Sequence, residues 1–183
     1  MRANEVTDYI KRFDFGECPL ERLPTVLSAA LQELANSDGL LLRVPASERS
    51  ICHRLAIYLE RFQNTINPSG SEWFADCEYN LRYDQRKRMH FPISEPSCSQ
   101  RHDCRCAKKV IFPDIILHRR ETTYNEMAIE TKILTNITED DIKKDLQRLV
   151  EFQRNENYNY NYVAFILFGL SSEPGYKVFT PLN

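Results

Sequence analysis

Phe112-Pro113-Asp114-Ile115-Ile116 is one half of the pattern that decides the fold of this 183-residue chain, and Ile129-Glu130-Thr131-Lys132 is the other. Both segments are apolar and rich in β-branched residues, which predicts two β-strands joined by the polar stretch between them. An antiparallel hairpin centred near Thr122 would place Asp114 directly opposite Glu130. Because side chains alternate between the two faces of a strand, Glu130 and Lys132 project from one face. We therefore expect two carboxylates and an ammonium group to converge on one small patch.

Such a patch suits one kind of chemistry. Two neighbouring carboxylates are ligands that a hard divalent cation such as Mg²⁺ prefers, and the bound metal lowers the pKa of a coordinated water. A lysine beside the metal orients or deprotonates the attacking water and offsets charge on a phosphate. Asp114, Glu130 and Lys132 all lie among apolar neighbours, where an unpaired charge costs free energy. The three side chains are therefore candidates for a functional site.

Pro113-Asp114 followed by Glu130-Thr131-Lys132 resembles the motif of the PD-(D/E)XK nuclease superfamily, the fold of many restriction enzymes and Holliday-junction resolvases. The resemblance implies that Asp114 and Glu130 are metal ligands and that Lys132 is the catalytic lysine. It also implies that the carbonyl of Thr131 is a further metal ligand. The implied activity is hydrolysis of phosphodiester bonds of DNA with Mg²⁺ or Mn²⁺, with bacterial or phage defence as a setting.

Many members of this superfamily carry a third acid on the first core helix, and Glu48 is the best match for it here. A glutamate in the first turn of a helix is also favoured by the helix dipole alone. Glu78, at the end of the first predicted core strand, is the alternative third acid. On the second core helix, Lys144 and Gln147 occupy the region of an auxiliary polar residue, although an exposed helical position is the simpler interpretation of both.

The predicted elements follow the order helix, strand, strand, strand, helix, strand. Ser47 is expected to cap a helix that runs to about Gln63, and residues 73–79 are expected to form the first core strand. Thr138 is expected to cap a helix that runs to about Arg154, and residues 162–170 are typical of a central strand. This order predicts an α/β fold with a mixed central sheet flanked by helices. It matches the αβββαβ core of the restriction-endonuclease-like fold.

The remaining segments lie outside that core. Residues 1–45 are expected to be an N-terminal helical extension, and residues 46–183 the nuclease-like domain. The helix after Pro24 is expected to end at residues 36–39, with a short strand at residues 40–42. Residues 176–179 are expected to add an edge strand. The N-terminal helices are candidates for covering the sheet, for contacting a partner protein or for forming a homodimer.

Charge is distributed unevenly along the chain. The formal net charge is −2, but Lys and Arg outnumber Asp and Glu between residues 79 and 120. A polyanionic backbone would be attracted to this stretch, which leads into the Asp114 strand. The predicted nucleic-acid contacts are Arg86, Lys87, Arg88, Arg119 and Arg120. A solvated charged loop explains the same composition and remains the alternative.

Six cysteines are present, and in a reducing compartment a disulfide framework is not expected. Three of them cluster with a histidine in one loop and are possible Zn²⁺ ligands: Cys98, His102, Cys104 and Cys106. The spacing C-x5-C-x-C is not that of a standard zinc knuckle, and C-x-C strains the chelate. An exposed, reduced loop is the favoured interpretation, and zinc is the alternative.

The composition is that of a folded domain, with 42% hydrophobic and 27% charged residues. No apolar run approaches the roughly eighteen residues that span a membrane, and the polar N-terminus lacks a signal-peptide core. We therefore expect a cytoplasmic protein with no membrane partner. The main hypothesis is a nuclease acting on DNA. The alternatives are a catalytically silent nucleic-acid-binding or scaffold protein on the same fold, and a zinc-stabilised interaction protein.

Overall fold

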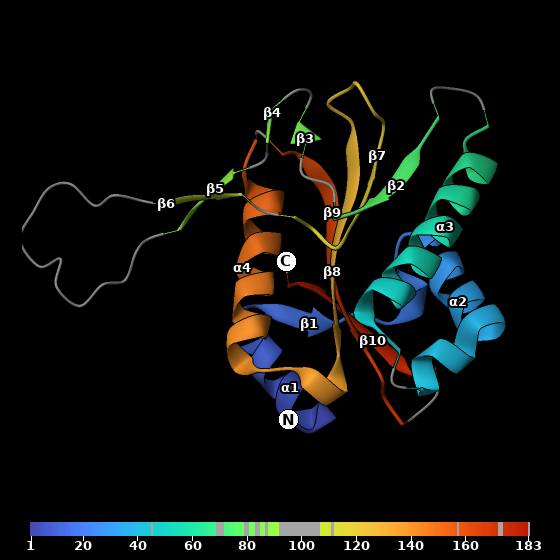
Figure 1. Cartoon of the computed structure of the whole chain (residues 1–183), viewed down its shortest axis with the longest axis vertical. Helices are drawn as coiled ribbons and strands as arrows, with labels where there is room; N and C mark the ends of the chain where they lie inside the picture. The colour runs from blue at the N-terminus through green and yellow to red at the C-terminus, as the bar shows by residue number, and fades with distance from the viewer. Residues whose placement is uncertain are drawn as a thin grey trace, which may run out of the picture.

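The computed structural model describes residues 1–44, 46–68, 72–78, 81–82, 85–86, 88–91, 107–110, 112–156, 158–171 and 174–182. For residues 81–82, 85–86, 88–91 and 107–110 it describes the backbone alone. The fold is α/β, with a six-stranded mixed sheet between helices (Figure 1). In spatial order the strands are β1 (Phe15–Glu17), β10 (Tyr176–Pro181), β9 (Tyr160–Phe168), β8 (Asn125–Ile133), β7 (Ile115–His118) and β2 (Phe74–Cys77).

The helices of the described chain lie on both faces of this sheet. They are α1 (Ala3–Lys11), α2 (Thr25–Arg43), α3 (Glu48–Ile66) and α4 (Glu139–Arg154), with short 3-10 turns η1 (Leu20–Arg22) and η2 (Leu134–Asn136). Two separate ribbons pair β3 (Leu81–Arg82) with β4 (Gln85–Arg86) and β5 (Arg88–Phe91) with β6 (Ala107–Val110). None of the described helices combines the length and apolar composition needed to span a lipid bilayer.

The centre of the sheet has the expected hairpin. Strands β2, β7 and β8 are antiparallel neighbours, whereas β8 and β9 pair in parallel, so that α4 supplies the crossover between them. Ile115 pairs with Ile129, and Leu117 with Met127, before a register shift near the turn. This register, continued by one residue, puts Asp114 across from Glu130. The predicted hairpin register is confirmed.

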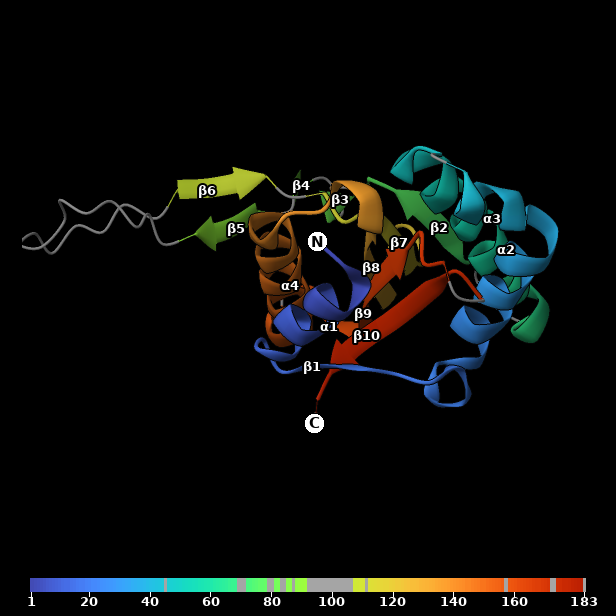
Figure 2. The same ribbon diagram turned by 90° about the horizontal axis from the view of Figure 1, so that it is seen from below.

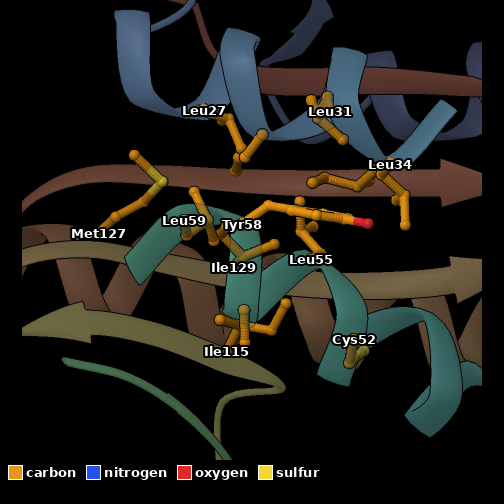
Figure 3. Packing of buried hydrophobic residues seen from close by; sticks show 14 of the residues in the cluster. Leu27, Leu31, Leu34, Cys52, Leu55, Tyr58, Leu59, Ile115, Met127 and Ile129 are labelled. Atoms are coloured by element: carbon orange, nitrogen blue, oxygen red, sulfur yellow. The ribbon is translucent and has the colours of Figure 1, made fainter. Parts of the chain in front are cut away.

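Both faces of the hairpin are buried, each against a different helix layer. On one face Ile115, Met127 and Ile129 pack with α2 and α3 (Figure 3). On the other face Ile116 and Ala128 pack with α1 and α4. Figure 2 shows the two helix layers on opposite sides of the strands. Strands buried on both sides have no alternation of polar residues, which explains why their sequences are almost continuously apolar.

The predicted helix starts are confirmed by their caps. The Ser47 hydroxyl accepts a hydrogen bond from the Ser50 N–H at 3.2 Å. Thr138 and Asp141 form a capping box at the start of α4, each side chain accepting from the other's main-chain N–H. Such caps satisfy N–H groups that the first helical turn leaves without partners.

The prediction of a short strand at residues 40–42 is wrong. The helix α2 continues through this segment to Arg43, with a kink at Asp38 (φ −122°, ψ 20°). Asp38 accepts hydrogen bonds from the side chains of Arg54 (2.7 Å) and Tyr58 (2.5 Å) on α3. Leu42 is buried in the same core as Leu34, so packing against α3 keeps the segment helical despite its turn-like sequence.

The strand β10 is not at the edge of the sheet, because β1 pairs outside it. Phe15 lies opposite Pro181 and is fully buried. A three-residue strand that contains a glycine has too little pattern to be recognised from sequence. Residues 1–44 thus contribute a strand to the sheet, and α2 shares one core with α3.

The β2 edge is fixed to the hairpin turn by charged groups. Asp76 Oδ2 lies 2.8 Å from His118 Nε2, and Asp76 Oδ1 accepts a hydrogen bond from Arg120 at 2.5 Å. Partial burial alone would raise the pKa of Asp76, but the hydrogen bonds from His118 and Arg120 lower it to about 2. Asp76 therefore stabilises the fold in its ionised form.

We expect Asp76→Asn to lower the free energy of unfolding by about 2 kcal/mol at pH 7. Because the folded pKa is below that of an ordinary aspartate, the wild-type advantage is complete above pH ~5 and is lost as the pH falls toward ~2. Urea unfolding of both proteins should show a difference at pH 3 that is about half of the difference at neutral pH. A difference that does not change with pH would contradict the assigned role of the carboxylate.

Candidate functional site

Asp114 lies at the start of β7 and is held by its neighbours on both sides. Its main-chain carbonyl accepts a hydrogen bond from the Glu78 N–H at 3.1 Å, which extends the pairing with β2. Its Oδ2 accepts from the Thr131 N–H at 2.7 Å and from the Thr131 hydroxyl at 3.1 Å. The Thr131 hydroxyl also lies 3.1 Å from the Cys52 sulfur on α3. The Asp114 carboxylate is therefore fixed against β8 by two donors of one residue.

Lys132 lies where the sheet meets both helix layers. Its ammonium group donates to Glu48 Oε1 on α3 at 3.2 Å and to the Thr131 carbonyl at 2.7 Å. It also lies 3.0 Å from Asp145 Oδ2 on α4. Burial alone would lower the pKa of Lys132, but the carboxylates of Asp145, Asp114 and Glu48 outweigh it and hold that pKa above its usual range. Lys132 is therefore a cation at neutral pH.

Glu130 is fully buried and faces α4. Its Oε1 is 3.0 Å from Arg148 Nε, and its Oε2 accepts a hydrogen bond from the terminal nitrogen of Arg148 at 3.1 Å. The same guanidinium contacts Asp145. Burial, together with the charges of Asp114 and Asp145, raises the pKa of Glu130 well above its usual range. The pKa of Asp145 is also raised, chiefly by burial.

These contacts define an acid–base cluster that consists of Glu48, Asp114, Glu130, Lys132, Asp145 and Arg148. Four of its members are candidates from the sequence, and the structure places Glu48 in contact with Lys132. Asp145 and Arg148 were not anticipated. Asp145 could have been found, because it falls at helical spacing on the apolar stripe of Ile142 and Leu146, where an acid is out of place. Lys144 and Gln147 are exposed, as predicted.

A cavity of about 610 Å³ opens beside the cluster on the α3 side of the sheet. Its lining consists of Ser47, Glu48, Arg49, Cys52, His53, Cys77, Glu78 and Asp114. Partial burial, together with the neighbouring carboxylates, raises the pKa of the Cys77 thiol to about 11. Burial also raises the pKa of Glu48, although Lys132 opposes it. The cavity is predominantly acidic.

Glu78, the alternative third acid, is also on the cavity wall. Its backbone has a left-handed conformation (φ 52°), and its Oε1 accepts a hydrogen bond from Arg49 Nε at 2.9 Å. Glu48, in contrast, contacts Lys132 directly. The geometry therefore brings Glu48 closer to the motif lysine than Glu78, while both acids line the same cavity.

Two of the arginines expected to bind nucleic acid, Arg119 and Arg120, are not beside this cavity. Arg119 and Arg120 follow the far end of β7 from Asp114. The guanidinium of Arg119 lies 4.5 Å from the centre of the Trp73 ring, and that of Arg120 lies 4.1 Å from the Phe74 ring. Lys87 and the side chains of Arg86 and Arg88 lie outside the described residues, as do the possible zinc ligands Cys98, His102, Cys104 and Cys106.

The cluster contains the types of atom that bind a hard divalent cation, since carboxylate and carbonyl oxygens are the ligands that Mg²⁺ prefers. Within the described chain, Glu130 Oε1 and Asp145 Oδ2 are buried oxygens that make ionic contacts but accept no hydrogen bond. Across the same residues, however, no three His, Cys, Asp or Glu side chains are grouped closely enough to hold a metal. Binding through Glu130 therefore requires its side chain or Arg148 to move.

No family model, no curated protein and no solved structure matches this chain. Its function must therefore be argued from its own residues and their geometry.

We expect Thr131→Val to cost about 1 kcal/mol of unfolding free energy, because it removes a hydroxyl that donates to Asp114 and leaves the main-chain bond intact. In an Asp114→Ala background the same change should cost less, by a coupling energy of about 0.5–1 kcal/mol. Chemical denaturation of the four proteins measures this coupling. Thr135→Val, at an exposed position, is the control and should be near neutral. Additive effects of the two changes would show that the hydroxyl does not hold Asp114.

Proposed function

We propose that this chain is a metal-dependent nuclease that hydrolyses phosphodiester bonds of DNA through Asp114, Glu130 and Lys132. The hairpin register carries the proposal, because pairing of Ile115 with Ile129 sets Asp114 across from Glu130, with Lys132 two residues further along. The order α3, β2, β7, β8, α4, β9, with β8 parallel to β9, supports a restriction-endonuclease-like core as part of the same proposal.

The cation would be held by Asp114, Glu130 and the Thr131 carbonyl, with Glu48 as the third acid. Asp114 and Glu48 line the cavity and can be reached from it, whereas Glu130 is fully buried and is not part of the lining. A bound Mg²⁺ or Mn²⁺ would supply a Lewis acid and an activated water. Lys132, as an ammonium, would offset the negative charge of the phosphate. Asp114, held rigidly by Thr131, would orient the reacting groups.

A catalytically silent nucleic-acid-binding or scaffold protein is the second candidate. One observation favours it: Arg148 already compensates the buried Glu130 carboxylate. Such a compensated cluster can exist for structural reasons alone. This candidate predicts DNA binding without cleavage.

The test is cleavage of plasmid, linear and single-stranded DNA and of RNA with Mg²⁺, with Mn²⁺ or with EDTA. We expect metal-dependent cleavage of DNA by the wild type. Asp114→Ala and Lys132→Ala should each lower the rate by about 100-fold or more, which is typical for loss of one electrostatic stabiliser. Lys144→Ala, on the exposed face of α4, is the matched control and should retain full activity.

Circular dichroism of each variant separates loss of chemistry from loss of fold. Full activity in both folded variants would exclude the proposed mechanism. Binding of DNA by a wild type that cleaves no substrate with either metal would favour the silent protein instead.

A further inference from the structure

Two residues of α4 reach into the acid–base cluster but are not part of the proposed nuclease motif. Asp145 is 2% exposed, and Arg148 lies one helical turn further along α4. A buried acid on the apolar stripe of a helix lowers stability unless its partners compensate it. The partners of Asp145 are two cations, Lys132 and Arg148.

Asp145 is one of two acids that contact the Lys132 ammonium. Glu48 contacts this ammonium at 3.2 Å from α3, and Asp145 contacts it at 3.0 Å from α4. The helices α3 and α4 are on opposite sides of the sheet (Figure 2). A flexible lysine side chain is thus held between two carboxylates that belong to different helices. Removing either one would release it toward the other.

Arg148 contacts the Glu130 carboxylate in a similar way. Its guanidinium contacts both oxygens of the fully buried Glu130 carboxylate and also contacts Asp145. The planar guanidinium matches the spacing of the two carboxylate oxygens, which fixes the orientation of the carboxylate as well as its charge.

We propose that Asp145 and Arg148 are positioning residues of the nuclease site, Asp145 for the Lys132 ammonium and Arg148 for the Glu130 carboxylate. Arg148 supplies positive charge to Glu130, and a divalent cation bound at Glu130 supplies charge to the same carboxylate. Arg148 and a divalent cation bound at Glu130 would therefore replace one another in part. This inference rests on the proposed function.

The variant Arg148→Met tests whether a divalent cation can replace the charge of Arg148. The measurement is thermal stability rather than activity. In EDTA the variant should melt at a lower temperature than the wild type, because Glu130 and Asp145 lose a partner. Millimolar Mn²⁺ or Mg²⁺ should recover about half of that deficit or more, since binding to the folded state stabilises it by mass action. Arg54→Met is the matched control: Arg54 pairs with Asp38 and Tyr58, away from the cluster, and its deficit should not respond to metal.

Arg148→Lys keeps the charge and is the second variant if Arg148→Met does not fold. Its deficit in EDTA should be smaller, and metal should still recover part of it. Equal metal responses of the Arg148 and Arg54 variants would overturn the inference while leaving the proposed function intact. Absence of any metal effect on stability or cleavage in the wild type as well would overturn both.

Asp145→Asn tests the positioning of Lys132. We expect kcat for DNA cleavage to fall by about 10- to 100-fold with KM changed by less than about 2-fold, as for loss of a group that orients a catalytic residue. Asp145→Glu, which retains the charge, should restore part of kcat. A raised KM with unchanged kcat, or equal losses in the Asn and Glu variants, would contradict the assigned role.

Discussion

The Thr131 N–H donates to the Asp114 carboxylate at 2.7 Å across the β7–β8 hairpin, and this bond is possible in one register only. A slip of one residue would turn every side chain of β8 to the other face of the sheet. Ile129 would leave the core beneath α2 and α3, and Ala128 would leave the core beneath α1 and α4. Because both faces are buried, a slip would disrupt both cores at once. The position of the carboxylates is thus fixed by hydrophobic packing rather than by the carboxylates themselves.

The acid–base cluster is hard to explain as a device for stability. Taking charges out of water costs several kcal/mol per ion, and well-packed apolar side chains are often equally or more stabilising in such places. Glu130 is nevertheless fully buried, and Asp145 nearly so, at positions where the sheet and α4 would accept apolar residues. Each is compensated by a cation that also contacts a second acid. Shared partners of this kind keep the geometry of Glu130, Asp145 and their two cations fixed, which is what a reactive site requires.

Local sequence signals predicted most of the core, and the misses share a physical cause. Helix caps and strand propensity depend on residues that are close together in the sequence. The caps at Ser47 and Thr138 and the β-branched runs of the hairpin could therefore be predicted. The helical conformation of residues 40–42 depends instead on contacts of Asp38 with α3. The strand β1 depends on pairing with β10, which is distant in sequence. Arg148 was missed for the same reason. On a helix it is an ordinary charged residue until the fold places Glu130 beside it.

The cavity adds an electrostatic requirement to any reaction at this site. Glu48, Glu78 and Asp114 line it, and Arg49 is already engaged with Glu78. An acidic cavity repels a phosphodiester unless a cation lies between the two. The N-terminus of α3 offers a weaker attraction, since its dipole favours anions by less than the repulsion of several carboxylates. Arg119 and Arg120 cannot offset this repulsion at contact distance, because they lie at the other end of β7. A cation bound in this cavity would offset that repulsion.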